Sequence, residues 1–195
     1  MDSKEYKFRN AEHSLSHTYL LPMVDKLLLD LKLPEGNKRV FDLGCGNGSV
    51  ANHFVTSGYE VTGIDPSLQG IQEGKKRWPD MKIYEGSAYD DLSSKYGQFP
   101  ALISLEVVEH VYQPRVYAKN LYNLIEQGGT AIISTPYHGY AKNIALAVAN
   151  KMDFHFTALL DNGHIKFWSM NTLSSLLKEV GFREVRFERV GRIPI

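Results

Sequence analysis

Three glycines alternate with other residues at positions 44–48, in the stretch GCGNG, directly after a short apolar run at 39–43. The run predicts a buried strand, and Gly48 opens a predicted helix that reaches about Ser57. A glycine-rich turn between a strand and a helix allows the backbone to approach a nucleotide-like ligand closely. The turn therefore predicts a site for a cofactor of this kind.

Asp42 places a carboxyl group inside the end of the predicted strand, immediately before the glycines. A carboxylate there would repel a pyrophosphate but could accept hydrogen bonds from an ammonium group or from backbone amides. Ser49 stands where a dinucleotide-binding turn would carry its third glycine. Both features disfavour a nicotinamide dehydrogenase and indicate a ligand with a cationic group. The alternative for Asp42 is a carboxylate that only caps the loop amides.

Asp65 ends a second predicted strand, at 59–65, and is suited to accept both hydroxyls of a ribose. A glycine turn, an acid beside it and a ribose-binding acid together describe a site for S-adenosylmethionine. Methyl transfer from this cofactor needs an acceptor lone pair in line with the sulfonium.

Alternating strands and helices must position these residues. Strands are expected at 39–43, 59–65, 81–86, 101–106 and 130–136, and helices at 15–31, 48–57, 67–77 and 115–125. The alternation predicts an α/β fold, a doubly wound and mostly parallel sheet with helices on both faces. A single domain is expected over residues 1–195. Ligands of such sheets bind beyond the carboxyl ends of the strands, where the informative residues lie.

Five stretches resemble, in order, the motifs of the class I (Rossmann-like) S-adenosylmethionine-dependent methyltransferases. They are VFDLGCGNGSV, VTGIDPS, EGSAYDDL, ALISLEVVEHV and LIEQGGTAIISTP, and they span residues 39–136. The stretch HIKFWSMNTLSSLLKEVGF is similar to the last helix of that family. The resemblance implies S-adenosyl-L-methionine as cofactor and S-adenosyl-L-homocysteine as product.

The resemblance also implies a set of cofactor-binding residues. Asp65 would bind the ribose, and a serine stands at position 87, where many relatives carry an acid that contacts the adenine amino group. That contact would pass to the backbone of Ala88 or Tyr89. The full set is Asp42, Gly44, Cys45, Gly46, Asn47, Gly48, Asp65, Pro66, Ser67, Ser87, Ala88, Tyr89, Leu105 and Glu106.

His110 is the candidate catalytic base, because a hydroxyl acceptor must lose its proton and His110 closely follows the fourth strand. The alternative for His110 is a helix-capping or partly buried histidine. The spacing of Glu106, Glu109 and His110, with His164 later in the chain, resembles the metal site of small-RNA 2′-O-methyltransferases. Two carboxylates and two imidazoles suit a divalent ion. A Glu-His pair here is also common in small-molecule methyltransferases, and a metal is not the favoured expectation.

Residues 137–168 form a predicted lid-like insertion that resembles that of the ubiquinone-biosynthesis O-methyltransferases. The expected substrate-lid residues are Tyr137, His138, His155 and His164. A predicted apolar helix at 141–152 would pack on the sheet, roof a pocket or make a peripheral membrane contact. At the C-terminus, 183–190 predicts one strand, and the family's last antiparallel strand is expected to be short or missing. A homodimer would cover the resulting edge.

The composition of the chain limits the classes of partner and the location that are expected. The 22 basic and 22 acidic residues cancel, which gives no electrostatic reason to expect a nucleic-acid partner. Cys45 is the one cysteine, so an internal disulfide is excluded and a reducing, cytoplasmic location is expected. The leading hypothesis is O-methylation of a small aromatic or lipid-like hydroxyl acceptor. The alternatives are a metal-assisted RNA 2′-O-methyltransferase and a non-catalytic S-adenosylmethionine-binding protein.

Overall fold

A parallel sheet forms the centre of the molecule. The computed structural model describes residues 8, 10–34, 36–156 and 158–191. Its five strands are β1 (Arg39–Leu43), β2 (Glu60–Asp65), β3 (Ile83–Glu85), β4 (Phe99–Leu105) and β5 (Ile125–Ser134). They lie in the order β3-β2-β1-β4-β5, and each neighbouring pair is parallel. The predicted doubly wound α/β sheet is confirmed, and its strand order reverses between β1 and β4.

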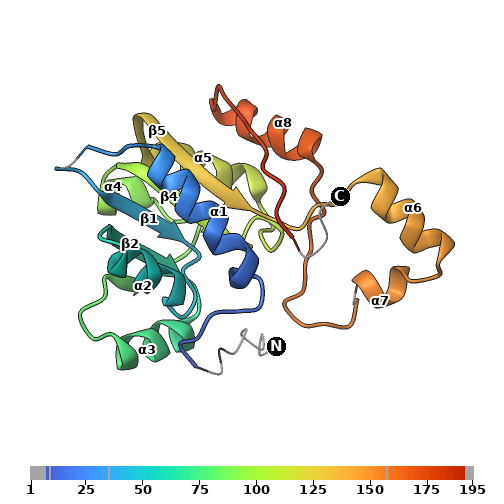
Figure 1. Cartoon of the computed structure of the whole chain (residues 1–195), viewed down its shortest axis with the longest axis horizontal. Helices are drawn as coiled ribbons and strands as arrows, with labels where there is room; N and C mark the ends of the chain where they lie inside the picture. The colour runs from blue at the N-terminus through green and yellow to red at the C-terminus, as the bar shows by residue number, and fades with distance from the viewer. Residues whose placement is uncertain (1–7, 9, 35, 157, 192–195) are drawn as a thin grey trace.

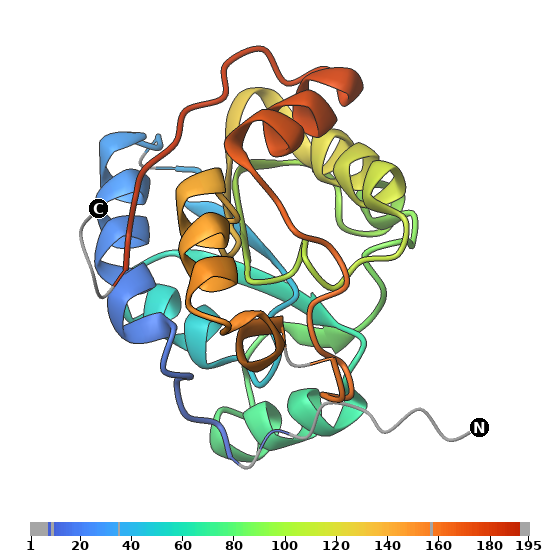
Figure 2. The same ribbon diagram turned by 90° about the vertical axis from the view of Figure 1, so that its right-hand side faces the viewer.

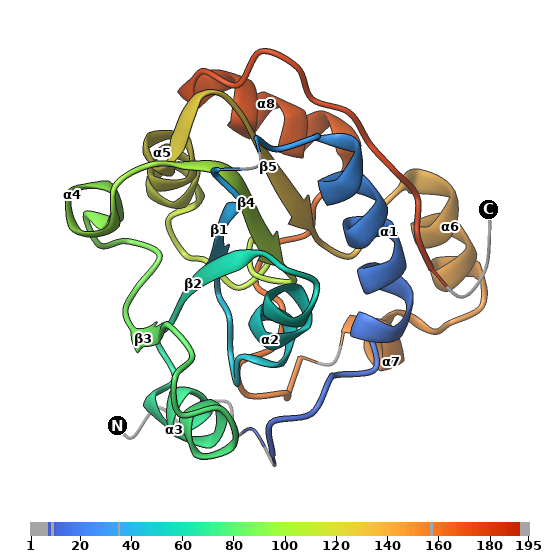
Figure 3. The same cartoon turned by 60° about the vertical axis from the view of Figure 1, so that its left-hand side comes forward.

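Helices cover both faces of this sheet (Figures 1 and 3). They are α1 (His17–Asp30), α2 (Ser49–Thr56), α3 (Leu68–Arg77), α4 (Leu92–Tyr96), α5 (Pro114–Leu124), α6 (Tyr140–Val148), α7 (Met152–Phe156) and α8 (Met170–Val180). Helices α1, α2 and α3 pack on one face, and α4, α5 and α8 pack on the other. The short α4 was not expected; Asp91 caps it by accepting from the Ser94 N–H.

The sheet separates two apolar cores because successive side chains of a strand point to opposite faces. In β1, Phe41 and Leu43 lie in the core beneath α5 and α8, whereas Val40 lies in the core beneath α1 and α2. Every residue of β4 is buried, as expected for an inner strand of a sheet that is covered on both faces. The carboxyl ends of β1, β2 and β4 therefore form a rigid edge on which a site can be built.

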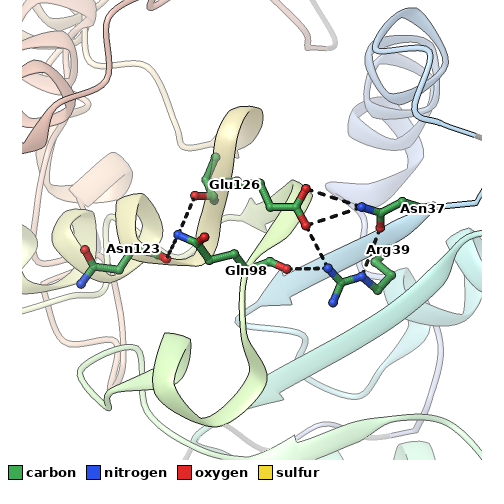
Figure 4. Close-up of polar contacts among 6 residues, drawn as sticks. Asn37, Arg39, Gln98, Asn123 and Glu126 are labelled. Carbon is green, nitrogen blue, oxygen red and sulfur yellow. Dashed lines mark hydrogen bonds and ion pairs between the residues drawn. The ribbon is translucent and has the colours of Figure 1, made fainter.

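Polar side chains join the strands at the opposite edge of the sheet (Figure 4). Arg39 donates from Nη2 to Glu126 Oε1 at 2.9 Å and to the Gln98 carbonyl oxygen at 2.7 Å. Its Nε donates to Asn37 Oδ1 at 3.1 Å. Gln98 Nε2 donates to the Asn123 carbonyl oxygen at 3.1 Å. These bonds hold the starts of β1, β4 and β5 together.

Residues 137–168 carry α6 and α7, which extend away from the sheet (Figures 1 and 2). The single helix expected at 141–152 is wrong: α6 ends at Val148, and Asn150 adopts φ +52° before α7 begins. A residue in the left-handed conformation interrupts a helix. Within their described residues, neither α6 nor α7 contains a buried residue, so the expectation that this helix packs on the sheet is also wrong.

The strand expected at 183–190 is absent from the structure of residues 183–191, and this prediction is wrong. The segment leaves α8 and returns to the start of α1 instead (Figures 2 and 3). There Val190 and Gly191 line a shallow hollow with Leu15 and Tyr19. Val190 thus lies beside α1, whereas Val185 packs against the core beneath α5 and α8. No antiparallel strand follows β5 up to residue 191, and residues 192–195 lie outside the described part.

Candidate active site

The glycine turn after β1 adopts the left-handed backbone conformation three times. The φ angle is +88° at Gly44, +54° at Gly46 and +74° at Gly48, values that glycine adopts without steric cost. A Cβ at Gly48 would also lie 2.9 Å from Ile83 Cδ1. The Gly48 carbonyl oxygen accepts from the Asn52 N–H at 2.8 Å, which starts α2. The predicted strand–turn–helix arrangement is confirmed.

Asp65 ends β2 and reaches across to this turn. Its Oδ2 accepts from the Gly46 N–H at 2.9 Å, and its Oδ1 accepts from the Ser67 N–H at 2.8 Å. The Ser67 hydroxyl oxygen in turn accepts from the Gly70 N–H at 3.1 Å and caps α3. The Asp65 carboxylate thus joins the turns that follow β1 and β2. Because each carboxylate oxygen has two lone pairs, it can also accept from the hydroxyls of a sugar.

Asp42 lies buried at the end of β1, with 2% of its surface exposed. Its Oδ2 has no hydrogen-bond partner among the described residues. Burial first, and the Asp65 carboxylate second, raise the pKa of Asp42 to about 8. A buried carboxylate without a partner is unfavourable, so a cationic or hydrogen-bond-donating ligand would stabilise it. This orphaned atom fits a cofactor that carries an ammonium group, as S-adenosylmethionine does.

Cys45 packs inside the turn. A Cβ at Gly63 would lie 2.8 Å from the Cys45 Cβ, so the turn and β2 approach closely here. Burial first, and then the Asp42 and Asp65 carboxylates, raise the pKa of the buried Cys45 thiol well above its ordinary value. The thiol is therefore protonated and unreactive, and Cys45 serves here as a small packing residue.

The loop after β3 is held by polar contacts on both sides. The Ser87 N–H donates to Asp90 Oδ2 at 2.7 Å, and the Ser87 hydroxyl oxygen accepts from the Tyr89 N–H at 3.2 Å. The Tyr89 hydroxyl oxygen accepts from the Tyr112 N–H at 2.8 Å. Asn120 on α5 donates to the Ala88 carbonyl oxygen at 2.8 Å. The loop thus holds Ser87, Ala88 and Tyr89 close to the carboxyl ends of the strands. The acidic side chain that contacts Ser87 is that of Asp90.

Glu106 follows β4 in a left-handed conformation, with φ +58°. Its N–H donates to the Ser134 hydroxyl oxygen at 3.0 Å, and its Oε1 accepts from that hydroxyl at 2.8 Å. A non-glycine residue in this region is uncommon and is often found at functional sites. Burial raises the pKa of Glu106 above its ordinary range. The neighbouring Leu105 is buried.

Glu109 is a buried acid, 1% exposed, and neither of its carboxylate oxygens has a hydrogen-bond partner among the described residues. Burial first, and then the Glu106 carboxylate, raise the pKa of Glu109 to about 8. The Glu109 carbonyl oxygen accepts from the N–H groups of Ile165 and Lys166 at 2.9 and 3.0 Å. These two bonds bring His164, from the far end of the insertion, next to Glu109.

Glu109, His110 and His164 converge. One ligand atom from each lies within 4.8 Å of the others, and the two imidazole rings meet edge to face with centroids 4.9 Å apart. Burial lowers the pKa of both histidines, so both rings are neutral at pH 7. Two neutral imidazoles and a carboxylate are ligands that divalent first-row metals accept. The fourth residue of the expected metal set, Glu106, contacts Ser134 instead but interacts with the Glu109 carboxylate.

A cavity of about 540 Å³ lies beside this cluster, lined by His138, Asn143, Phe156, Ala158, His164 and Phe167. Its walls are mainly aromatic: the Phe167 ring lies 4.9 Å from both His138 and Phe156, measured between centroids. Burial first, and Lys142 second, lower the pKa of His138 to about 4, and its ring is neutral at pH 7. The ring centroid of His155 lies 5.7 Å from that of His138. Tyr137 pairs with Trp168 in a β-bridge at the base of the insertion.

A family model described as a methyltransferase domain matches residues 13–186. The chain belongs to this methyltransferase family. Together with the glycine turn, Asp65 and the parallel sheet, this membership makes it an S-adenosylmethionine-dependent methyltransferase.

Relatives and solved structures agree with this assignment. The methyltransferase is 28% identical over 165 residues to the ubiquinone biosynthesis O-methyltransferase of Thiobacillus denitrificans, which covers 78% of the chain. The chain spans 68% of that relative's length and about half the length of another curated relative of the same name.

The fold also matches a SAM-dependent methyltransferase from Archaeoglobus fulgidus, with a TM-score of 0.61 at 19% identity over 85% of this chain and 70% of that one. It matches the methyltransferase domain of bacterial CtHen1-CN as well, with a TM-score of 0.62 at 23% identity over 89% and 90% of the two chains.

The structure of the methyltransferase thus gathers most of the predicted site residues at one edge, and it adds residues that the sequence did not indicate. The side chain of Asn47 points to the N-terminal segment, where it donates to the carbonyl oxygens of Asn10 and Glu12. The sequence did not indicate Asn143 or Asp90, because amide and acid side chains are common in loops and in the first turns of helices. Pro66 is exposed beside Asp65.

Within the described residues, no helix is long and apolar enough to cross a membrane.

Proposed function

We propose that this methyltransferase transfers a methyl group to a hydroxyl oxygen of a small aromatic or lipid-like acceptor. The observation that carries the proposal is the aromatic cavity of about 540 Å³ that shares His164 with the Glu109–His110–His164 cluster. An aromatic lining suits a flat apolar acceptor. The O-methyltransferase name of the curated relatives supports oxygen as the methylated atom. A cytoplasmic location agrees with the single reduced cysteine.

In this proposal the residues around the glycine turn hold the cofactor. Bound S-adenosylmethionine supplies an electrophilic methyl group on a sulfonium. Asp65 accepts from the ribose hydroxyls, and Asp42 accepts from the ammonium group, which would favour the ionised form of its carboxyl group. The loop of Ser87, Ala88 and Tyr89 borders the adenine through its backbone.

His110 removes the acceptor proton. Burial lowers its pKa, so the ring is neutral at pH 7 and able to accept a proton. It lies next to His164, which also lines the cavity. Replacement of His110 by Ala is expected to lower kcat by about 10²–10⁴-fold with unchanged binding of S-adenosylhomocysteine.

A divalent cation at Glu109, His110 and His164 is the alternative to a His110 base, because an imidazole bound to a metal has no lone pair left to accept the acceptor proton. Glu109 is buried, its carboxylate oxygens have no hydrogen-bond partner among the described residues, and its Oε1 lies 3.9 Å from His164 Nε2. Both imidazoles are neutral, so the donor set fits a cation. A cation there would lower the pKa of an acceptor hydroxyl. Titration with Mn²⁺, followed by electron paramagnetic resonance, is expected to show one site in the wild type and none in His164→Ala. His155→Ala, in the lid but outside the cluster, is the control; equal binding by all three proteins would refute the site.

The outer face of α6 supports contact with an apolar partner. Tyr140, Ile144 and Val148 recur every four residues and are 87%, 63% and 84% exposed. Residues at this spacing lie on one face of a helix. In sedimentation with phosphatidylglycerol vesicles, Ile144→Ser is expected to reduce the bound fraction. Leu29→Ser, at a 70% exposed leucine of α1, is expected to leave it unchanged. Equal sedimentation of both variants with the wild type would contradict the membrane contact.

Incubation with radiolabelled S-adenosylmethionine and either catechol or a short RNA duplex tests the acceptor class. Methyl transfer to catechol that His110→Ala abolishes would support the proposal. Transfer to RNA alone would favour the 2′-O-methyltransferase alternative, for which the convergence of Glu109, His110 and His164 is the supporting observation. Binding of S-adenosylhomocysteine with transfer to neither probe would favour a non-catalytic protein.

A further inference from the structure

An N-terminal segment is anchored to the first turn of α3 through one side chain. Gln69 Oε1 accepts from the Phe8 N–H at 2.9 Å, and Gln69 Nε2 donates to the Phe8 carbonyl oxygen at 2.6 Å. The amide of one glutamine thus satisfies both backbone groups of one residue, as a neighbouring strand would. The two residues are 61 positions apart in the sequence.

A second anchor comes from the glycine turn itself. Asn47 Nδ2 donates to the carbonyl oxygens of Asn10 and Glu12 at 2.7 and 3.0 Å. Asn47 Oδ1 accepts from the Ser49 N–H at 3.1 Å, inside the turn. Both amide hydrogens and one oxygen lone pair of Asn47 are therefore used for positioning. Ala11, between the two carbonyl groups, is buried.

The Phe8 ring lies against two glycines of the site. A Cβ at Gly46 would lie 2.7 Å from Phe8 Cζ, and a Cβ at Gly70 would lie 2.7 Å from Phe8 Cδ2. Gly46 is also the residue whose N–H donates to Asp65. Phe8 thus touches the part of the turn that orients Asp65, and the lack of side chains at Gly46 and Gly70 makes room for the ring.

We propose that Phe8 and residues 10–12 form a strap that holds the glycine turn in its cofactor-binding conformation, with Gln69 and Asn47 as positioning residues. The inference rests on the assignment of this turn to S-adenosylmethionine. The strap acts through Gly46 on Asp65. Because coupling between two equilibria is reciprocal, docking of the strap strengthens cofactor binding by the same factor by which the cofactor strengthens docking.

Calorimetric titration with S-adenosylhomocysteine tests the strap in the full chain. Gln69→Leu removes both bonds to Phe8 and is expected to raise the Kd on the order of 5- to 30-fold, the effect of losing two hydrogen bonds. Gln72→Leu is the matched control, because Gln72 is an exposed glutamine one turn further along the same helix. Its Kd is expected to equal that of the wild type. Phe8→Ala, which removes the ring but keeps the backbone bonds, is expected to raise the Kd as well.

Hydrogen exchange separates a positioning role from a merely structural one. In the wild type, S-adenosylhomocysteine is expected to slow exchange at the amides of residues 10–12, and in Gln69→Leu this slowing is expected to be lost. Wild-type binding with an equal Kd in Gln69→Leu and Phe8→Ala would overturn the strap alone. Absence of binding by the wild type would overturn the proposed function, and the strap with it.

Discussion

Replacement of Asp42 by Asn removes the titration of a buried acid without changing its shape. Asp42 is 2% exposed, and burial together with Asp65 raises its pKa from the ordinary 3.8 to about 8. The native state therefore holds this proton more tightly than the unfolded chain does. As a result, the free energy of unfolding of the wild type falls as the pH rises from about 4 to about 8, and this contribution is constant above that range.

The size of the effect follows from the shift. A change of about 4 pKa units at ~1.4 kcal/mol per unit gives on the order of 5 kcal/mol over the whole range, of which on the order of 3 kcal/mol falls between pH 5 and pH 8. Asp42→Asn lacks this pH-dependent loss of stability. Its free energy of unfolding, relative to that of the wild type, is therefore expected to rise by on the order of 3 kcal/mol from pH 5 to pH 8. Titrating groups that do not interact with Asp42 are common to both proteins and cancel in the difference.

Urea unfolding at pH 5, 6, 7 and 8 measures the difference directly. Asp30→Asn, at an exposed acid of α1, is the control and is expected to follow the wild type at every pH. A constant difference between Asp42→Asn and the wild type from pH 5 to pH 8 would refute the reasoning. Saturation with S-adenosylhomocysteine is expected to flatten the wild-type curve, because the ligand's ammonium group favours the ionised carboxylate.

Four further substitutions test the structure around the site by urea unfolding. Gly58→Ala, at φ +88° with open space around it, is expected to cost about 1–2 kcal/mol, and Gly48→Ala more, because its Cβ would also meet Ile83; equal costs would contradict the tight packing of the turn. Tyr117 donates to the buried Ser104 hydroxyl at 2.9 Å, which donates to the β1 carbonyl of Leu43 at 2.8 Å. Tyr117→Phe is expected to cost about 1 kcal/mol and Ser104→Ala about 2–3 kcal/mol, since the latter leaves two groups unpaired; the reverse order would contradict this relay.

The parallel sheet and the cofactor edge could be predicted from the sequence because local patterns encode them. The GCGNG turn, the strand before it and Asp65 lie close together in the chain, and the structure keeps that arrangement. The strap could not be predicted, because the contact between Phe8 and Gln69 links residues 61 positions apart without any sequence motif.

The wrong predictions for residues 141–152 and 183–190 have a shared physical cause. The apolar stretch at 141–152 and the alternating segment at 183–190 have patterns typical of buried elements. Their partners, however, depend on tertiary packing that the patterns do not encode. Asn150 divides the first at a left-handed residue. In the second, Val190 lies beside α1 and Val185 packs on the core beneath α5 and α8.

The central claim is that Asp65 and the glycine turn bind the adenosyl cofactor. Calorimetric titration with S-adenosylhomocysteine, on the wild type and on Asp65→Ala with and without Mg²⁺, tests it most directly. The account predicts one site in the wild type, loss of that site in Asp65→Ala, and unchanged binding in the exposed control Asp30→Ala. Failure of the wild type to bind, or equal binding by Asp65→Ala, would contradict it.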